Sequence, residues 1–209
     1  MNLSNDEHRL TSPEQLTALY GEVAPVSIKK EISYVHPLYR QFIEASPFAL
    51  LATSGPDGLD VSPRGDPAGF VVVEDEHTLL LPDRRGNNRL DSLRNLLADP
   101  RVALLFLIPG VGETLRVNGT AGITTDPTLQ GRFEMDGKRP KCVLVIHVET
   151  VYFQCARALH RSNLWQPVPP DAPRPVPTAG QILAALSQDA TLGETYDRDL
   201  PERLRTTLY

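Results

Sequence analysis

The fold that we expect for this chain is decided by the stretch Phe48–Leu90, FALLATSGPDGLDVSPRGDPAGFVVVEDEHTLLLPDRRGNNRL. Its apolar runs Phe48–Thr53, Gly69–Val73 and Thr78–Leu81 have the length of strands, and the clusters of Gly, Pro and Asp between them are typical of turns. The stretch ends in a loop rich in Arg, Asn and Gly. It therefore predicts a meander of short strands and then a turn that opens a helix.

The first part of this stretch predicts a hairpin. Ala49–Thr53 lacks polar residues at alternate positions, which favours a strand covered on both faces. Ser54–Gly58 is a turn sequence, alternation resumes at Leu59–Ser62, and Pro63–Asp66 then interrupts the second strand. Arg64 in that interruption has two interpretations, a surface arginine in a turn or an arginine at a strand end that faces an anion. Its planar fork of donors suits phosphate and carboxylate oxygens.

A second basic cluster, Pro82–Leu90, follows the last strand of the stretch. Leucines at helical spacing come next and Asp99–Pro100 ends them, so we expect a helix with Asn88 as its N-cap and Asp91 three residues on. Free backbone N–H groups, two amide side chains and three guanidinium groups would then lie in one short segment. A phosphomonoester is the simplest partner for such a group, and a solvated basic turn is the alternative.

The rest of the chain adds strands rather than βαβ units. Arg101–Ile108 is almost wholly apolar, and Glu113–Ala121 alternates and carries Gly119 in mid-strand, which indicates a bulge or a close backbone approach. A short helix is expected over Pro127–Phe133 and a long strand over Cys142–Phe153. We therefore expect a mainly β protein with flanking helices, built on a six- to seven-stranded antiparallel barrel.

Four segments are expected along the chain. They are N-terminal helices packed on the barrel (residues 1–45), the barrel itself (46–165), a Pro-rich connector (166–177) and a C-terminal helical extension (178–209). Ser12 with Gln15 forms a capping box at the first helix, and a second helix is expected over Pro37–Ala45. Pro201 is expected to interrupt the last helix.

Composition excludes several classes of function. The formal net charge is −5 without any block of Lys or Arg, which argues against a nucleic-acid or anionic-membrane surface. The first ten residues contain no apolar segment for export or membrane anchoring, so we expect a cytoplasmic protein. Cys142 and Cys155 lack metal-ligand spacing and are expected to be two half-buried thiols, with a ligand contact as the alternative for Cys155. No metal site or hydrolase motif is expected.

The order of these motifs resembles the flavin-binding split barrels related to pyridoxamine 5′-phosphate oxidase, in particular a bacterial branch of FMN-dependent enzymes. The resemblance spans roughly Ser46 to Trp165. It rests on four landmarks in chain order, ATSGPDGLDVSPRGD, LLLPDRRGNNRLDSLRNLLADPRV, LLFLIPGVGETLRVNGTA and CARALHRSNLW.

The resemblance implies a split-barrel homodimer with FMN at the subunit interface and the phosphate held by basic residues. It implies a flavin-dependent oxidoreductase that acts on a small molecule, and the alternatives are a non-catalytic flavin carrier or sensor, or a relative that binds F420 or haem. No lysine follows Arg64 at the position where the oxidase has one, and Leu159–Arg161 only echoes the substrate motif of that enzyme. The substrate therefore stays open.

Six residues lie on the motifs that hold the cofactor phosphate in that family: Ser62, Arg64, Gly65, Asn87, Asn88 and Arg89, with Arg84 and Arg85 as nearby alternatives. Further candidate cofactor contacts are Arg116, Cys155, Arg157, Arg161 and Trp165. Arg157 and Arg161 are four residues apart and share a helix face. Their segment has two interpretations, one in which it reaches the flavin of the partner subunit and one in which it is a surface helix with Trp165 in the core. No side chain stands out as a catalytic acid, base or nucleophile.

Overall fold

The computed structural model describes residues 8–209. The expectation that the chain begins without an export segment falls mostly on residues 1–7, which lie outside the described part. Seven strands are described: β1 (Phe48–Gly55), β2 (Gly58–Gly65), β3 (Val72–Asp75), β4 (Thr78–Pro82), β5 (Arg101–Leu107), β6 (Thr114–Thr124) and β7 (Val143–Gln154). Among residues 8–209 no helix is both long and apolar enough to cross a bilayer.

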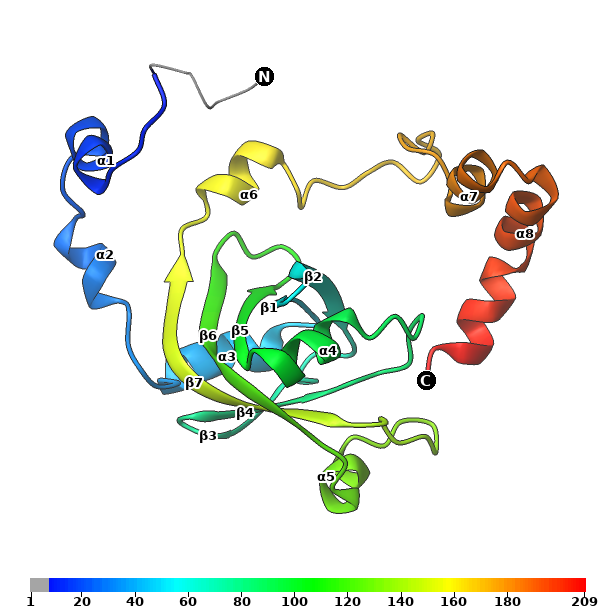
Figure 1. Cartoon of the computed structure of the whole chain (residues 1–209), viewed down its shortest axis with the longest axis horizontal. Coiled ribbons are helices and arrows are strands. Elements are labelled where there is room, and N and C mark those ends of the chain that lie inside the picture. The colour runs from blue at the N-terminus through cyan, green and yellow to red at the C-terminus, as the bar shows by residue number, and fades with distance from the viewer. Residues whose placement is uncertain (1–7) are drawn as a thin grey trace.

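The strands form one antiparallel sheet in the order β2-β1-β5-β6-β7-β4-β3. The sheet curls round one main core, and β2 and β3 are its edges (Figure 1). This is the split barrel that the sequence predicts. The split of the barrel is the gap between the two ends of this sheet, where β2 faces β4 and β3. The ends of β2 and β4 lie on either side of this split and carry the two basic clusters.

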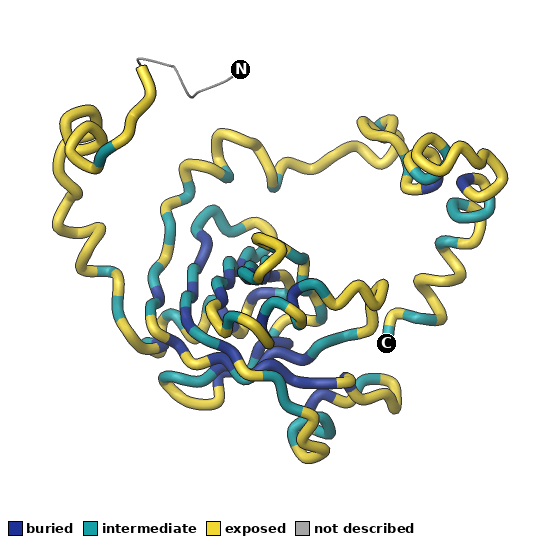
Figure 2. Tube along the Cα trace, in the orientation of Figure 1, coloured by how far each residue is buried: buried dark blue, intermediate teal, exposed yellow. Residues whose placement is uncertain are grey.

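Side chains alternate between the two faces of these strands, and one face forms the core. In β1 the buried residues are Ala49, Leu51 and Thr53, and their partners across β5 are buried as well (Figure 2). The largest fully buried side chains are Phe106, Ile43, Leu51, Leu79, Leu81, Leu104, Leu115, Leu144 and Ile146. Because successive residues point to opposite faces, the register fixes which residues of the edge strand β2 face inward.

Eight helices are described between residues 8 and 209: α1 (Pro13–Tyr20), α2 (Pro25–Lys29), α3 (Pro37–Ala45), α4 (Asp91–Ala98), α5 (Pro127–Arg132), α6 (Arg157–Ser162), α7 (Ala179–Ser187) and α8 (Ala190–Thr207). The capping box of Ser12 and Gln15 at α1 is confirmed. Helix α3 packs on the sheet through Ile43. By contrast, α1 and α2 contain no buried residue and extend away from the barrel (Figures 1 and 2).

Two details of the meander differ from expectation. Strand β2 continues through Pro63 to Gly65 instead of stopping, because an edge strand tolerates a proline without losing a bond to a second neighbour. Strand β3 begins at Val72, two residues after Phe70. Phe70 and Val71 are buried, so their hydrophobicity reflects the core rather than strand pairing.

The irregularity predicted at Gly119 is confirmed. The register between β6 and β7 shifts between Asn118 and Gly119, which marks a β-bulge. A Cβ atom on Gly119 would lie 1.9 Å from the carbonyl oxygen of His147. The strands therefore approach too closely here for any larger residue.

The C-terminal extension is a helical hairpin, α7 and α8, that stands apart from the barrel (Figure 1). Gly180 and Gly193 allow the two helices to touch, since a Cβ on either would lie within 2.5 Å of the backbone of the other. Asp197 of α8 accepts hydrogen bonds from the backbone of Gly180 and the hydroxyl of Thr178. Helix α8 runs through Pro201, so the expected interruption is wrong.

Candidate anion-binding site

Two reciprocal ion pairs cross the split of the barrel. Arg64 at the end of β2 donates from Nη1 to Oδ1 of Asp83 after β4 at 2.7 Å. Arg84 donates from Nε to Oδ2 of Asp66 after β2 at 2.6 Å. We call these four residues the clasp. No side chain in it is more than 17% exposed, so solvent screens these pairs far less than the ion pairs at the surface.

Arg84 makes two further contacts besides its ion pair. Its Nη1 donates to the backbone oxygen of Phe133 at 2.6 Å. Its guanidinium carbon lies 5.3 Å from the ring centroid of Tyr209, and the hydroxyl of that tyrosine donates to Oδ1 of Asp66 at 2.7 Å. The pKa of Tyr209 is raised by its hydrogen bond to Asp66. The clasp therefore includes a contact from the far end of the chain.

A chain of hydroxyl groups connects the clasp to helix α4. Arg64 donates from Nε to Oγ of Ser62 at 3.2 Å, and the hydroxyls of Ser62 and Ser92 lie 2.9 Å apart. Ser92 in turn donates to Oδ2 of Asp60 at 2.6 Å. The register places Asp60, Ser62 and Arg64 opposite the inward residues of β1, so all three face the interior side of the sheet. This row of polar groups therefore runs along the inward face of the edge strand β2.

The start of helix α4 differs from the sequence-based expectation. Its first residue is Asp91, its N-cap is Leu90, and no side chain caps it, so the assignment of Asn88 as N-cap is wrong. The reason is that Asn88 and Leu90 both adopt the left-handed conformation, with φ of 59° and 62°, which delays the start of the helix. Arg89 is 74% exposed and pairs with Asp91 at 2.7 Å.

The structure brings some of the expected site residues together and separates others. Ser62, Arg64 and Arg84 meet through the clasp and the hydroxyl chain. Asn87, Asn88 and Arg89 are exposed on the same loop, with no hydrogen bond to β2 among the described residues. Arg89 lies near enough to Asp60 for that carboxylate to contribute to its raised pKa, after the larger effect of Asp91. Like Asn88, the residues Gly65 and Arg85 are exposed, and they follow Arg64 and Arg84 directly in the sequence.

Arg116 lies on the other face of the sheet. Across the neighbouring strands, Arg116 lies opposite Leu105 and then Leu50, whose side chains point outward. Arg64 instead lies opposite Ala49 and then Phe106, which are both buried. Arg116 donates from Nη1 to the hydroxyl of Tyr152 at 2.8 Å. Within one chain it therefore belongs to a different surface from the clasp.

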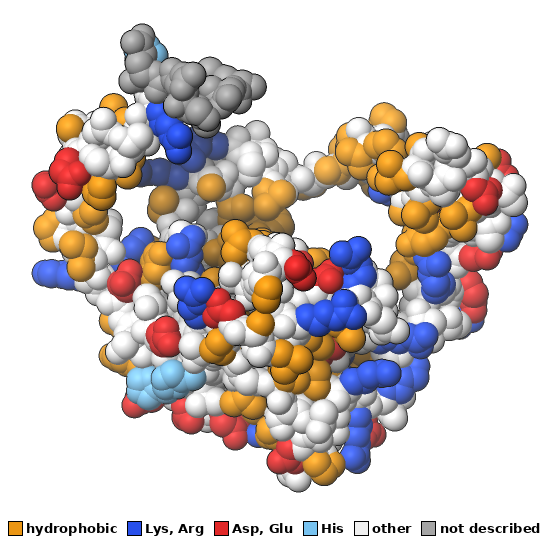
Figure 3. All heavy atoms as spheres, viewed as in Figure 1, with side chains coloured by type: hydrophobic (Ala, Val, Ile, Leu, Met, Phe, Trp, Pro, Cys, Tyr) orange, Lys and Arg blue, Asp and Glu red, His pale blue; other side chains and the backbone are white. Residues whose placement is uncertain are grey.

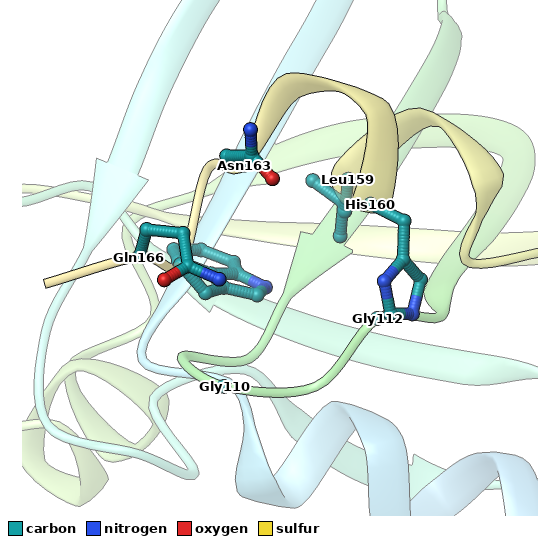
Figure 4. A pocket seen from close by; sticks show the side chains of 7 residues that line it. Gly110, Gly112, Leu159, His160, Asn163 and Gln166 are labelled. Carbon is teal, nitrogen blue, oxygen red and sulfur yellow. The ribbon is translucent and has the colours of Figure 1, made fainter.

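The segment after β7 forms its own small pocket. Helix α6 exposes Arg157 and Arg161, while Trp165 is half-buried and donates from its indole N–H to the backbone oxygen of Val111 at 2.7 Å. Beside it lies a cavity of about 160 Å³, lined by Gly110, Gly112, Leu159, His160, Asn163, Trp165 and Gln166 (Figure 4). In one chain Trp165 thus packs on the turn between β5 and β6.

The two cysteines differ from the expectation that both are half-buried. Cys142 is buried and Cys155 is exposed. Burial raises the pKa of the Cys142 thiol to about 11, and the nearby Asp83 carboxylate adds to this effect. The backbone N–H of Arg157 lowers the pKa of the Cys155 thiol, and the charges of Arg157 and Lys30 contribute.

Iodoacetamide at pH 8 is therefore expected to modify Cys155 at least about 100-fold faster than Cys142, because the thiolate is the reactive form and burial also blocks access. Peptide mass mapping after timed quenching measures both rates. The Cys155→Ser variant serves as control and should lose the fast phase. Equal rates at the two sites would contradict the described burial.

The clasp, its hydroxyl chain and the contact with the C-terminal tyrosine include five residues that the sequence analysis of basic motifs did not identify. They are Asp60, Asp66, Asp83, Ser92 and Tyr209. A signal for two of them exists, because Asp66 follows Arg64 by two residues and Asp83 directly precedes Arg84. Each basic cluster thus carries an aspartate close to an arginine, a pattern that allows reciprocal pairing across the split. Tyr209 offers no comparable signal.

The arginines of the clasp and of the loop after β4 can still bind an anion, although aspartates already pair with some of them. Arg64 and Arg84 each use Nε and Nη1 within the chain and Arg89 uses Nε, so each keeps Nη2 for a ligand. Arg85 makes no ion pair among the described residues and is exposed. Free N–H groups at the first turn of α4 and the side-chain amides of the loop add neutral donors. The residues present therefore suit a phosphate group.

Comparison with known proteins gives one family. The model of the pyridoxamine 5′-phosphate oxidase family matches residues 35–155, more than half of the chain. No curated protein matches. Solved structures that are similar include a variant of HupZ from Group A Streptococcus (18% identity, 57% of this chain and 99% of that one, TM-score 0.49) and general stress protein 26 from Bacillus anthracis (19%, 54% and 88%, 0.41). A third is a protein of Clostridium acetobutylicum related to that stress protein (16%, 55% and 84%, 0.43).

The fold is a split barrel, and the clasp and the hydroxyl chain gather arginine and serine side chains along its edge strand β2. The chain belongs to the pyridoxamine 5′-phosphate oxidase family.

Proposed function

We propose that this protein binds FMN and acts as a flavin-dependent oxidoreductase on a small molecule. The observation that carries the proposal is the clasp with its hydroxyl chain, which gathers Arg64, Arg84 and Ser62 across the split of the barrel. When bound, FMN would supply the transfer of a hydride or electron pair. The side chains described above would hold and orient it.

Arg64 is the main phosphate ligand in this proposal. Its guanidinium is positioned by Asp83 and Ser62 and keeps Nη2 free, so it meets a phosphate without having to be ordered first. Arg84 contributes in the same way from the other side of the split. Arg89, Arg85, Asn87 and Asn88 are exposed around this centre and would add charge and amide donors. Ser62 would contribute its hydroxyl, and Gly65 would offer its backbone at the end of the same strand.

A homodimer completes the site in this proposal. The outward face of β1 and β2 carries Phe48, Leu59 and Val61, which are 37%, 86% and 61% exposed. Exposed apolar side chains along one sheet face indicate a contact surface rather than a solvated one. We place the cofactor ring at this interface, with Arg116, Cys155, Arg157, Arg161 and Trp165 as the groups that the partner subunit would contribute.

The absorbance spectrum of the purified protein tests the proposal. We expect the two visible bands of an oxidised flavin, and the compound released on denaturation is expected to have the mass of FMN. A haem or deazaflavin spectrum would overturn the assignment of the cofactor. Bleaching of the bands by NADH or NADPH under anaerobic conditions would support an oxidoreductase, whereas flavin that resists every reductant offered would favour a carrier.

A further inference from the structure

The C-terminal hairpin is attached to the barrel at one point besides its connector. Among residues 8–209, the hydrogen bonds between residues 178–209 and the barrel all involve Tyr209, which lies two positions beyond α8. Helices α7 and α8 otherwise pack against each other (Figure 1). Lys and Arg side chains gather where the end of α8 approaches the barrel (Figure 3). The position of the hairpin is therefore set at the clasp.

Tyr209 contacts both members of one clasp pair. Its hydroxyl donates to Oδ1 of Asp66, which leaves Oδ2 for Nε of Arg84. Its ring covers the guanidinium of Arg84, and its backbone oxygen accepts a hydrogen bond from Lys138 at 3.0 Å. The side chain of Asp66 is only 3% exposed as a result. A cation under an aromatic ring with a shared carboxylate has little freedom to reorient.

From these contacts we infer that Tyr209 is a positioning residue of the anion site, and that it makes the affinity for a phosphate-bearing ligand depend on the docked state of the C-terminal hairpin. This inference rests on the proposed function. With Tyr209 docked, Arg84 holds one orientation and presents Nη2. With Tyr209 released, Arg84 keeps its bonds to Asp66 and Phe133 but loses the ring that covers it, so its remaining freedom has to be lost at the moment of binding, which costs affinity.

The experiment compares FMN with riboflavin, which lacks the phosphate, in titrations of apo-protein that follow the quenching of flavin fluorescence. For Tyr209→Ala we expect FMN affinity to fall about tenfold and riboflavin affinity to stay unchanged, because only the phosphate meets Arg84. Tyr209→Phe keeps the ring but loses the bond to Asp66, and an intermediate loss of about threefold is expected. A loss of general stability would affect both flavins equally.

The matched control is Tyr196→Ala. Tyr196 also packs under an arginine, Arg203 at 4.2 Å, but within the hairpin, so FMN affinity should not change. Amide hydrogen exchange of the apo-protein gives a second measurement that needs no flavin. Residues 84–90 are expected to exchange faster in Tyr209→Ala than in the wild type and Tyr196→Ala.

The outcomes separate the two proposals. If the wild type binds FMN no better than riboflavin, the proposed phosphate site fails, while faster exchange in Tyr209→Ala would still support the docking of Tyr209. If Tyr209→Ala binds FMN as well as the wild type or better, or if its loop exchanges at the wild-type rate, the positioning role is overturned.

Discussion

Replacement of Gly119 by alanine is expected to destabilise the protein by about 3 kcal/mol or more, the upper end for overpacked interiors, and to lower Tm by about 10 °C. The reason is steric. The added Cβ would lie 1.9 Å from the carbonyl oxygen of His147 and 3.0 Å from its carbon, and both are backbone atoms that cannot turn aside. Relief requires β6 and β7 to separate in the middle of the barrel. Thermal unfolding followed by circular dichroism measures the effect.

Gly122→Ala is the matched control, because Gly122 lies on the same strand and a Cβ added there would meet no other atom within 4 Å. It should change Tm by no more than about 2 °C, as surface substitutions usually do. Equal effects of the two substitutions would show that the close approach of β6 and β7 is not present in the protein.

Replacement of Arg64 by alanine is expected to weaken FMN binding about 30-fold, which corresponds to about 2 kcal/mol for a charged hydrogen-bonding group. Arg64 is 17% exposed and positioned by Asp83 and Ser62, whereas Arg89 is 74% exposed. Arg89→Ala should therefore cost much less, about threefold, in line with exposed charges. Titration of apo-protein with FMN measures both, and the double variant is expected to release FMN altogether.

Two further variants separate the ligand role of Arg64 from its role in closing the barrel. Asp83→Asn removes the ion pair that positions Arg64 but keeps its guanidinium, so stability should fall, while FMN affinity should fall by clearly less than in Arg64→Ala. Arg101→Ala removes an exposed arginine of β5 that pairs with Asp99, and neither property should change. An Arg64→Ala protein that binds FMN like the wild type would refute the assignment of this ligand.

Much of the fold could be predicted because its signals are local. Strand length, turn residues and the Ser12 capping box depend on neighbours in sequence, and the structure has them at the expected places. The glycine in mid-strand predicted the bulge for the same reason. The breaks expected at Pro63 and Pro201 were wrong, because the effect of a proline depends on its structural context. Pro63 lies on an edge strand, and Pro201 lies inside helix α8, which continues on both sides of it.

The candidate site could be predicted only in part. Arg64 and Arg84 stand out as cations near turns, but their pairing with Asp83 and Asp66 depends on the curl of the sheet, which brings together the ends of two strands that are not adjacent in it. The left-handed Asn88 and Leu90 moved the helix start away from its expected cap. The contact of Tyr209 with Asp66 joins residues 143 positions apart, and no local pattern predicts it.

The affinity of the wild-type protein for FMN compared with riboflavin tests the central claim most directly, because the two flavins differ only in the phosphate that the clasp is proposed to hold. Isothermal titration of apo-protein with each flavin gives both dissociation constants. We predict that FMN binds at least about tenfold more tightly, a difference of about 1.4 kcal/mol, with one FMN per chain. Equal affinity for both flavins, or no binding of either, would contradict the proposal that this split barrel holds FMN through its clasp.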